Sequence, residues 1–271
     1  MTPTFVVSLA RAHDRRTAVC KHLQELGITF RLIDAVDGRA LQADEVAKIV
    51  EPGRTMHPGA IGCYLSHLEI YRQVLAEQIP LALILEDDAR LSPRCVNFLQ
   101  TVKPTSAFDY CFLDSDDHND RGPIFFDPDD AAELAPGYCA YRLSAGPHTT
   151  HAYMITLEGA RKRLEHAFPL RKPIDLYDHL PYPIVFRAIV RPKLAWVSEH
   201  SLVSFTSQKD MPTRSLSFSW LRKYPTFYKL RDFVRMRHWR QRRVAQKLVA
   251  EGVLTSGRRW TALPQGRDVL R

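Results

Sequence analysis

The chain has 271 residues, a formal net charge of +8 and 45% hydrophobic residues, a composition typical of a globular protein with a full core. The sequence contains no run of about eighteen consecutive apolar residues, and the apolar run near its start has no basic leader, so we expect neither a transmembrane helix nor a secretory signal. Five scattered cysteines without a C-x-x-C pair predict free thiols in a reducing compartment, not a disulfide framework or a zinc site. They are Cys20, Cys63, Cys95, Cys111 and Cys139.

The first third of the chain predicts alternating strands and helices. β-Branched and aromatic residues predict strands at residues 4–9 and 28–36. Between them, Val19, Leu23 and Leu26 have helical spacing, and Gly27 is a plausible C-cap. Further elements are expected as follows: a helix at 59–78, strands at 81–86, 108–114 and 151–156, a loop to about residue 137, a helix at 158–168, and one or two strands within 183–197.

This order predicts an α/β fold with a mostly parallel sheet and a ligand at the carboxyl ends of its strands. The composition changes near Ser207. Residues 222–247 hold ten Lys or Arg residues and one acid, so this segment carries +9 and the rest of the chain −1. We therefore expect a domain over residues 1–210 and a basic, largely helical appendage over residues 211–271.

Three consecutive acids, Glu86, Asp87 and Asp88, follow the apolar run at residues 81–86. Alternation along an extended chain points Glu86 and Asp88 to one side and Asp87 to the other. Neighbouring carboxylates repel each other unless a cation neutralises them, and oxygen ligands suit Mg²⁺ or Mn²⁺. Such an ion could bind the diphosphate of a nucleotide. A solvated acidic turn is the alternative.

A second acidic segment at residues 114–120 competes for this role. An EF-hand loop starting at Asp114 would need an acid or Asn where His118 stands and Glu where Phe125 stands, which excludes that calcium site. A polar loop is the better interpretation, with a role at the rim of the site as the alternative.

Other common catalytic motifs are missing. His148 and His151 precede an expected strand, but their spacing matches no zinc motif. The sequence contains no G-x-S-x-G elbow, no P-loop and no G-x-G-x-x-G turn.

Five motifs, in this order, resemble glycosyltransferase family 25, the bacterial lipooligosaccharide galactosyltransferases related to collagen galactosyltransferases. They are V-V-S-L followed by D-R-R, G-A-I-G-C-Y-L-S-H at 59–67, L-E-D-D at 85–88, T-H-A-Y-M-I-T with E-G-A-R at 150–161, and P-I-D at 173–175. The resemblance covers about residues 4–210. Ala60 departs from it, because the family often has an acid at this position.

The resemblance implies a GT-A-like nucleotide-binding domain with a UDP-sugar donor, usually UDP-galactose, and Mn²⁺ (or Mg²⁺). Asp88 would bind the metal, and Glu86 would contact the metal or the ribose. For a third ligand, His151 or His200 are candidates. The donor-binding residues implied are Ser8, Leu9, Arg15 or Arg16, Ser66, His67, Asp87, Thr150 and His151.

The family's commoner inverting chemistry needs a general base at the acceptor hydroxyl. Asp175 matches the family's P-[VI]-D and is the first candidate, and Asp178, one helical turn on, is the second. The alternative is that Asp175 caps a short helix beginning at Leu176.

The expected function is metal-dependent transfer of a sugar, galactose first, from a UDP-sugar to a glycan or glycolipid acceptor such as lipooligosaccharide. The alternatives are transfer of another hexose (glucose or an amino sugar) in cell-surface polysaccharide synthesis, and metal-dependent phosphohydrolysis or nucleotidyl transfer.

Residues 222–247 are expected to bind an anionic membrane surface, which would place the enzyme in the cytoplasm, on the inner face of the cytoplasmic membrane. Packing of this segment on the domain is the alternative. Nucleic-acid binding is disfavoured because the rest of the chain is nearly neutral.

Overall fold

The structure is a computed structural model that describes residues 2–113, 125–143, 146–147, 149–177, 180, 183–189, 192–198 and 261–262. Several sequence-based expectations lie outside these residues: those for the acidic segment 114–120, for His148, Asp178 and His200, and for the basic segment 222–247. Within the described ranges, no helix is long and apolar enough to cross a membrane.

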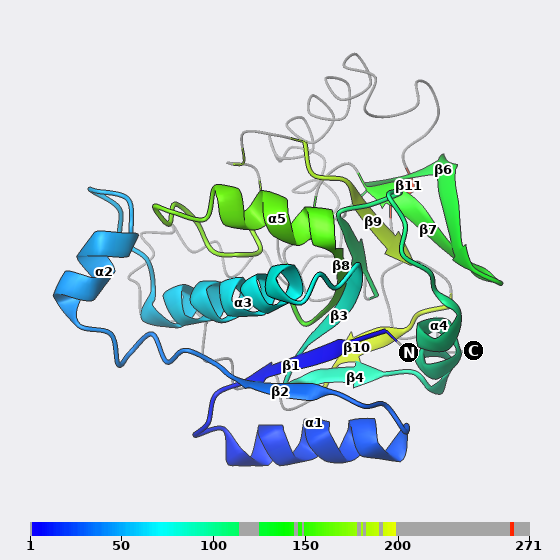
Figure 1. Cartoon of the computed structure of the whole chain (residues 1–271), viewed down its shortest axis with the longest axis horizontal. Helices are drawn as coiled ribbons and strands as arrows, with labels where there is room; N and C mark the ends of the chain where they lie inside the picture. Colours follow the sequence, from blue (N-terminus) through cyan, green and yellow to red (C-terminus); the bar gives the residue numbers. More distant parts are fainter. Residues whose placement is uncertain are drawn as a thin grey trace, which may run out of the picture.

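The described residues form an α/β fold around one large sheet (Figure 1). The helices are α1 (His13–Glu25), α2 (Ala43–Ile49), α3 (Pro58–Ala76), α4 (Pro93–Thr101) and α5 (Leu157–Glu165). The strands are β1 (Thr4–Ser8), β2 (Arg31–Asp34), β3 (Leu81–Glu86), β4 (Ala89–Leu91), β5 (Tyr110–Phe112), β6 (Phe125–Ala135), β7 (Tyr138–Leu143), β8 (Ala152–Thr156), β9 (Phe186–Ile189), β10 (Ala195–Val197) and β11 (Thr261–Ala262).

The large sheet has nine strands in the order β11-β6-β7-β9-β5-β8-β3-β1-β2, and β4 pairs with β10 in a separate two-stranded sheet. Strands β1, β2, β3, β5, β6 and β9 run in one direction, and β7, β8 and β11 run in the other. The prediction of an α/β protein whose strands mostly run the same way is therefore confirmed.

Helices cover both faces of this sheet. In Figure 1, α3 and α5 lie on one side of the central strands and α1 lies on the other. Strand β1 shows the resulting alternation: Phe5 and Val7 belong to the core that contains Leu68 of α3, whereas Val6 belongs to the core that contains Val19 of α1. Burial on both faces explains why the central strands are continuous apolar runs.

The sheet has a topological switch point at β1, where successive strands are added first on one side and then on the other. Strand β2 pairs with β1 on one side, and β3 pairs with β1 on the other, both parallel to it. Helix α1 connects β1 to β2, and the connection from β2 to β3 contains α3 on the opposite face. In open α/β sheets, a crevice forms beyond the carboxyl ends of the strands at such a switch point.

The expectation of a loop reaching residue 137 is wrong for its last part. Strands β6 and β7 form an antiparallel hairpin in which Ala135 is opposite Tyr138. Pro136 and Gly137 make the connection, and Gly137 has the positive φ of 79° that the second central residue of a type II turn requires. The β6 sequence contains Pro128 and four acids, so it lacks the apolar alternation that marks a strand.

Candidate functional site

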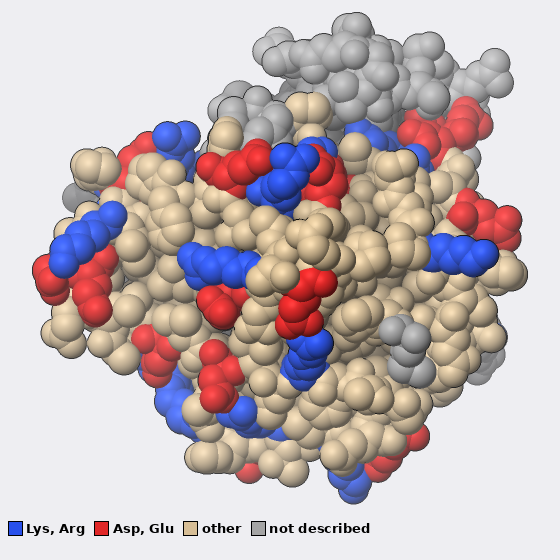
Figure 2. All heavy atoms as spheres, in the orientation of Figure 1, with Lys and Arg blue, Asp and Glu red and all other residues tan. Residues whose placement is uncertain are grey.

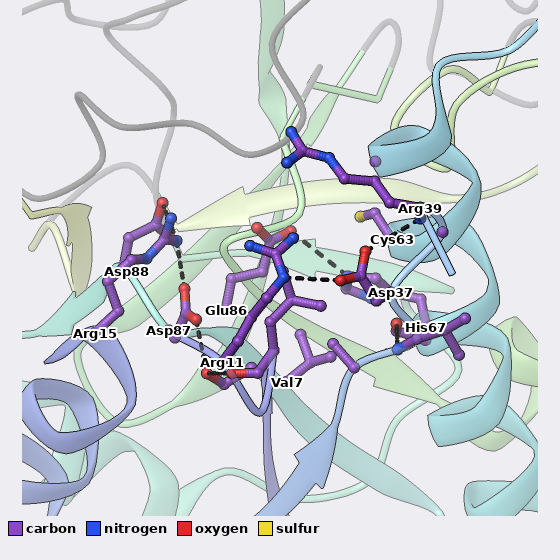
Figure 3. Close-up of a pocket in the computed structure, with 17 residues that line it drawn as sticks. Val7, Arg11, Arg15, Asp37, Arg39, Cys63, His67, Glu86, Asp87 and Asp88 are labelled. Carbon is purple, nitrogen blue, oxygen red and sulfur yellow. Dashed lines mark hydrogen bonds and ion pairs between the residues drawn. The ribbon is translucent and has the colours of Figure 1, made fainter. Parts of the chain in front are cut away.

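A cleft lies at the carboxyl ends of β1, β2 and β3 (Figure 3), and the empty space in it, including space that is open to solvent, is about 730 Å³. It is therefore situated at the switch point of the sheet. The lining residues are Val7, Ser8, Leu9, Arg11, Arg15, Ala35, Val36, Asp37, Gly38, Arg39, Gly59, Cys63, Ser66, His67, Glu86, Asp87 and Asp88.

All three consecutive acids line this cleft, and the carboxylates of Asp87 and Asp88 both pair with the Arg15 guanidinium, so the expectation that Asp87 points away from Asp88 is wrong. Strand β3 ends at Glu86, and the chain turns at Asp87 and Asp88 before β4 begins. The alternation of an extended strand does not continue through a turn, and this is why the third carboxylate also reaches the cleft.

Asp87 is a buried carboxylate that ties three segments together. It accepts a hydrogen bond of 2.7 Å from the Ser8 hydroxyl at the end of β1, and it forms an ion pair with Arg15 of α1. Burial raises the pKa of Asp87, although the charge of Arg15 and the Ser8 hydrogen bond oppose this effect. The contacts of Asp87 are thus with the walls of the cleft.

Asp88 is less well satisfied. Its Oδ2 lies 3.1 Å from the Arg15 guanidinium, but its buried Oδ1 has no hydrogen-bond partner among the described residues. Burial, and next the charge of Glu86, raise the pKa of Asp88 to about 6. A buried carboxylate oxygen without a partner beside a second carboxylate favours a cation.

The side chain of Glu86, the last residue of β3, lies between Thr150, which precedes β8, and His67 of α3. Its side chain accepts a hydrogen bond from the Thr150 hydroxyl, and its Oε1 is 3.5 Å from Nε2 of His67. Burial would raise the pKa of Glu86, but the His67 imidazole, Thr150 and His151 outweigh it and lower the pKa. Glu86 is therefore the acid in this cluster that keeps its negative charge most readily.

The β2 side of the cleft carries residues that the sequence did not single out. Asp37 accepts a 2.7 Å hydrogen bond from Arg11 and a 3.1 Å hydrogen bond from the backbone N–H of Arg39. The Arg11 hydrogen bond is the main cause of the lowered pKa of Asp37. An available signal was the Asp37-Gly38 pair directly after an expected strand, at the same sheet edge as Ser8 and Glu86.

Helix α3 packs against this segment without space for a side chain. A Cβ on Gly62 would lie 2.4 Å from the carbonyl oxygen of Val36, and one on Gly38 would lie 1.9 Å from that of Pro58. Ser66 accepts a 2.8 Å hydrogen bond from the Val36 N–H. The G-x-x-x-S spacing of α3 thus fixes the residue 36–38 segment of the cleft wall.

Leu9, Arg16, Thr150 and His151 were also predicted to bind the donor, and the structure places them differently. Leu9 lines the cleft, whereas Arg16 is not among its lining residues and pairs with Asp34 at 2.7 Å. Thr150 contacts Glu86. His151 accepts the Glu86 N–H on its backbone oxygen at 2.9 Å, and its ring bonds to Thr149.

Asp175 lies in a turn next to the cleft. The Leu176 N–H donates a 3.0 Å hydrogen bond to the Pro173 carbonyl, and Leu176 is not in a helix, so the alternative of a helix cap there is not supported. Burial raises the pKa of the Cys63 thiol, and the negative charges of Glu86 and then of Asp175 add to this effect. Arg163, which is buried, donates a 3.2 Å hydrogen bond to the carbonyl of Ile174 and so anchors this turn.

Comparisons with known proteins show the family to which the chain is similar. The family model of glycosyltransferase family 25 (LPS biosynthesis protein) matches residues 1–177. The human protein named inactive glycosyltransferase 25 family member 3 is 33% identical over 192 residues, covering 65% of this chain and 31% of that protein. Procollagen galactosyltransferase 1-B of Xenopus laevis is 31% identical over 239 residues, covering 83% of this chain and 36% of that protein.

Among solved structures, a glycosyltransferase involved in the glycosylation of the major capsid of PBCV-1 matches with a TM-score of 0.32 and 11% identity, over 62% of this chain and 63% of that chain. The chain spans about a third of the length of the curated relatives described above.

Proposed function

Because the chain belongs to glycosyltransferase family 25, we propose that it transfers a sugar from a UDP-sugar, UDP-galactose first, to a hydroxyl of a glycan or glycolipid such as lipooligosaccharide. The observation that carries this proposal is the cleft at the switch point of the sheet, where Asp88 has a buried oxygen without a partner beside Glu86. Such a cleft suits a nucleotide, and such an oxygen suits a cation.

Asp88 and Glu86 would hold the divalent cation, Mn²⁺ or Mg²⁺. When bound, this ion neutralises the charge that develops on the departing diphosphate. The unpartnered Oδ1 of Asp88 supports the assignment, because burial without a partner disfavours the carboxylate unless a cation is present. Asp87 would keep its contacts with Ser8 and Arg15 and hold the turn in place.

The donor would extend from the acids toward the end of β2. Arg15, beside Asp87 and Asp88, is close to the position of the diphosphate in this arrangement and would add a positive charge. Asp37, which favours its charged form, would accept hydrogen bonds from the ribose hydroxyls, a role that acids after a second strand perform in nucleotide-binding sheets. Arg11 and Arg39 flank it on the cleft wall.

Asp175 would act as the general base. Its turn lies beside Cys63, which lines the cleft, so an acceptor hydroxyl between Asp175 and the donor could pass its proton to this carboxylate. The base, the acceptor oxygen and the sugar would then be arranged for inversion at the anomeric carbon. Arg163 would hold the turn that presents Asp175.

The experiment that tests this function is a donor screen that measures products. The full chain is incubated with UDP-galactose, UDP-glucose and UDP-linked amino sugars, with Mn²⁺ or with a chelator. Release of UDP that requires Mn²⁺ and is greatest with one sugar is the expected result. Release of sugar phosphate instead would identify a phosphohydrolase or nucleotidyltransferase, and no turnover of any donor would place the chain with the relatives that are named inactive.

We also propose that the basic segment 222–247 binds an anionic membrane surface on the cytoplasmic side. This segment carries +9, whereas the face in Figure 2 shows acidic and basic side chains of the described residues lying among one another. Each basic residue near anionic headgroups contributes about 1 kcal/mol. Co-sedimentation with phosphatidylserine vesicles should be strong for the full chain and weak for residues 1–210. Equal binding of the two would contradict a membrane role for the segment.

A further inference from the structure

Cys63 and His67 lie one turn apart on the same face of α3, and both line the cleft beside Glu86 (Figure 3). One ligand atom from each of these three residues can be chosen so that all three atoms lie within 4.8 Å of one another. A tetrahedral zinc ion separates its ligand atoms by about 3.3–3.7 Å, so the three side chains need to approach by only roughly 1 Å.

His67 is prepared for a ligand on one of its ring nitrogens. The ring is fully buried, and its Nδ1 makes a 2.7 Å hydrogen bond with the Tyr153 hydroxyl, which bonds in turn to Tyr71 at 2.7 Å. Its Nε2 faces Glu86 and has no hydrogen-bond partner among the described residues. Metal-binding histidines are commonly oriented in this way, by a hydrogen bond at the other nitrogen.

The charges around Cys63 also favour a cation. The Glu86 carboxylate lies within 4.8 Å of the other two ligand atoms, and Asp88 lines the same cleft. The negative charges of these two acids attract a divalent ion.

We propose that Cys63, His67 and Glu86 form a site for a thiophilic divalent cation, Zn²⁺, and that zinc bound there inhibits donor binding by taking Glu86 away from the manganese site. Sulfur, imidazole and carboxylate ligands together select Zn²⁺ over Mn²⁺, which prefers oxygen. On binding, the Cys63 thiol loses its proton to water and its sulfur binds zinc, leaving a fourth position open. The site itself depends only on the geometry, whereas the inhibition rests on the proposed function.

The spacing of the five cysteines does not indicate this site. Cys63 and His67 form a C-x-x-x-H pair within a helix, an i, i+4 spacing that places both side chains on one face. The third ligand, Glu86, comes from a strand and is brought to them only by the packing of α3 on the sheet.

The binding test uses the full chain and needs no nucleotide. Co²⁺, a spectroscopic substitute for Zn²⁺, should give a thiolate-to-cobalt absorption band that Zn²⁺ abolishes. The band should be present in the wild type and in Cys139→Ser, a control at a half-buried cysteine on β7, and absent in Cys63→Ser. No band in the wild type, or an undiminished band in Cys63→Ser, would overturn the site.

A second measurement needs no variant and so does not depend on how a variant folds. Zn²⁺ should slow alkylation of Cys63 in the wild type about tenfold or more, as measured by mass spectrometry of peptides, while the rate at Cys139 stays the same. Equal rates at Cys63 with and without Zn²⁺ would overturn the site.

The inhibition is tested by UDP titration in Mn²⁺, with and without one equivalent of Zn²⁺. Zinc should raise the Kd for UDP about tenfold or more in the wild type. In Cys63→Ser, the Kd with zinc divided by the Kd without zinc should approach one, whatever the affinity of that variant without zinc. Equal zinc effects in both proteins would reject the inhibition. If the wild type binds no UDP, the proposed function fails, while the cobalt band and the alkylation rates still report on the zinc site.

Discussion

The Ser8 hydroxyl donates a 2.7 Å hydrogen bond to Oδ2 of Asp87, joining residues 79 positions apart in the sequence. Ser8 ends β1 and Asp87 follows β3, so the bond crosses the switch point of the sheet at the base of the cleft. Both side chains are buried. This bond fixes the turn from which Asp88 projects, and it links the stability of the fold to the shape of the proposed metal site.

Substitution Ser8→Ala should lower the free energy of unfolding by about 1–3 kcal/mol, because Asp87 would remain buried with one donor fewer. Urea unfolding of the wild type, Ser8→Ala, Asp87→Ala and the double variant measures the coupling between the two residues. We expect a coupling energy of about 1 kcal/mol. Additive effects in this cycle would show that the hydrogen bond contributes nothing to stability.

The candidate base is tested by separating transfer from donor binding. Asp175→Asn should reduce sugar transfer by about 100-fold or more, since general bases typically contribute that much, while the Kd for UDP stays within about twofold. Asp44→Asn, at an exposed acid of α2, is the matched control and should match the wild type in both assays. Loss of UDP affinity in Asp175→Asn would instead place this carboxylate in the donor site.

The packing of α3 against the cleft wall predicts a strong effect at Gly62. A Cβ there would lie 2.4 Å from the Val36 oxygen, so Gly62→Ala should force the backbone apart and cost about 1–3 kcal/mol of stability. It should also weaken UDP binding, because Val36 lines the cleft. Glu69→Ala, on the exposed side of α3, serves as the control. Unchanged stability of Gly62→Ala in urea would contradict the close packing.

The environment of His22, which does not line the cleft, predicts that the stability of the fold depends on pH. Its Nε2 accepts the Leu91 N–H at 2.9 Å, and burial, followed by the charge of Arg90, lowers the pKa of His22 below its ordinary value of 6.5. Below about pH 6.5 the unfolded chain therefore binds more protons at this position, so the stability that His22 contributes at neutral pH is lost as the pH falls.

The measurement is the free energy of unfolding in urea at about pH 7.5 and about pH 5.5 for the wild type and His22→Gln. Glutamine can still accept the Leu91 N–H but does not titrate in this range. The decrease in stability on acidification should be smaller in His22→Gln. An equal decrease in both proteins would show that His22 makes no contribution to it.

Much of the fold could be predicted from local pattern. Continuous apolar runs marked β1 and β3 because helices bury both faces of these strands, and Gly27 marked the end of α1 because its φ of 66° suits a residue without a side chain. The carboxyl edge of the sheet, with the acids after β3, also followed from the order of the elements, whereas Ser8 was implied by the family resemblance.

The remainder depends on contacts between distant segments. The orientation of Asp87 follows from a turn that begins one residue after β3, and Arg11 joins the cleft through its bond to Asp37, which is 26 positions away. Cys63 of α3 and Glu86 of β3 come together only through the packing of α3 on the sheet. Periodicity within one segment contains no information about such meetings.

The most direct test of the central claim, that Asp88 holds a divalent cation for a nucleotide donor, is calorimetric titration of UDP with Mn²⁺ or with a chelator present. The wild type should bind UDP at least about tenfold more tightly with Mn²⁺ than with the chelator. In Asp88→Asn, whose new side chain has nearly the same shape as aspartate, the ratio of these two affinities should fall to about one. An unchanged Mn²⁺ effect in Asp88→Asn, or no Mn²⁺ effect in the wild type, would contradict the account.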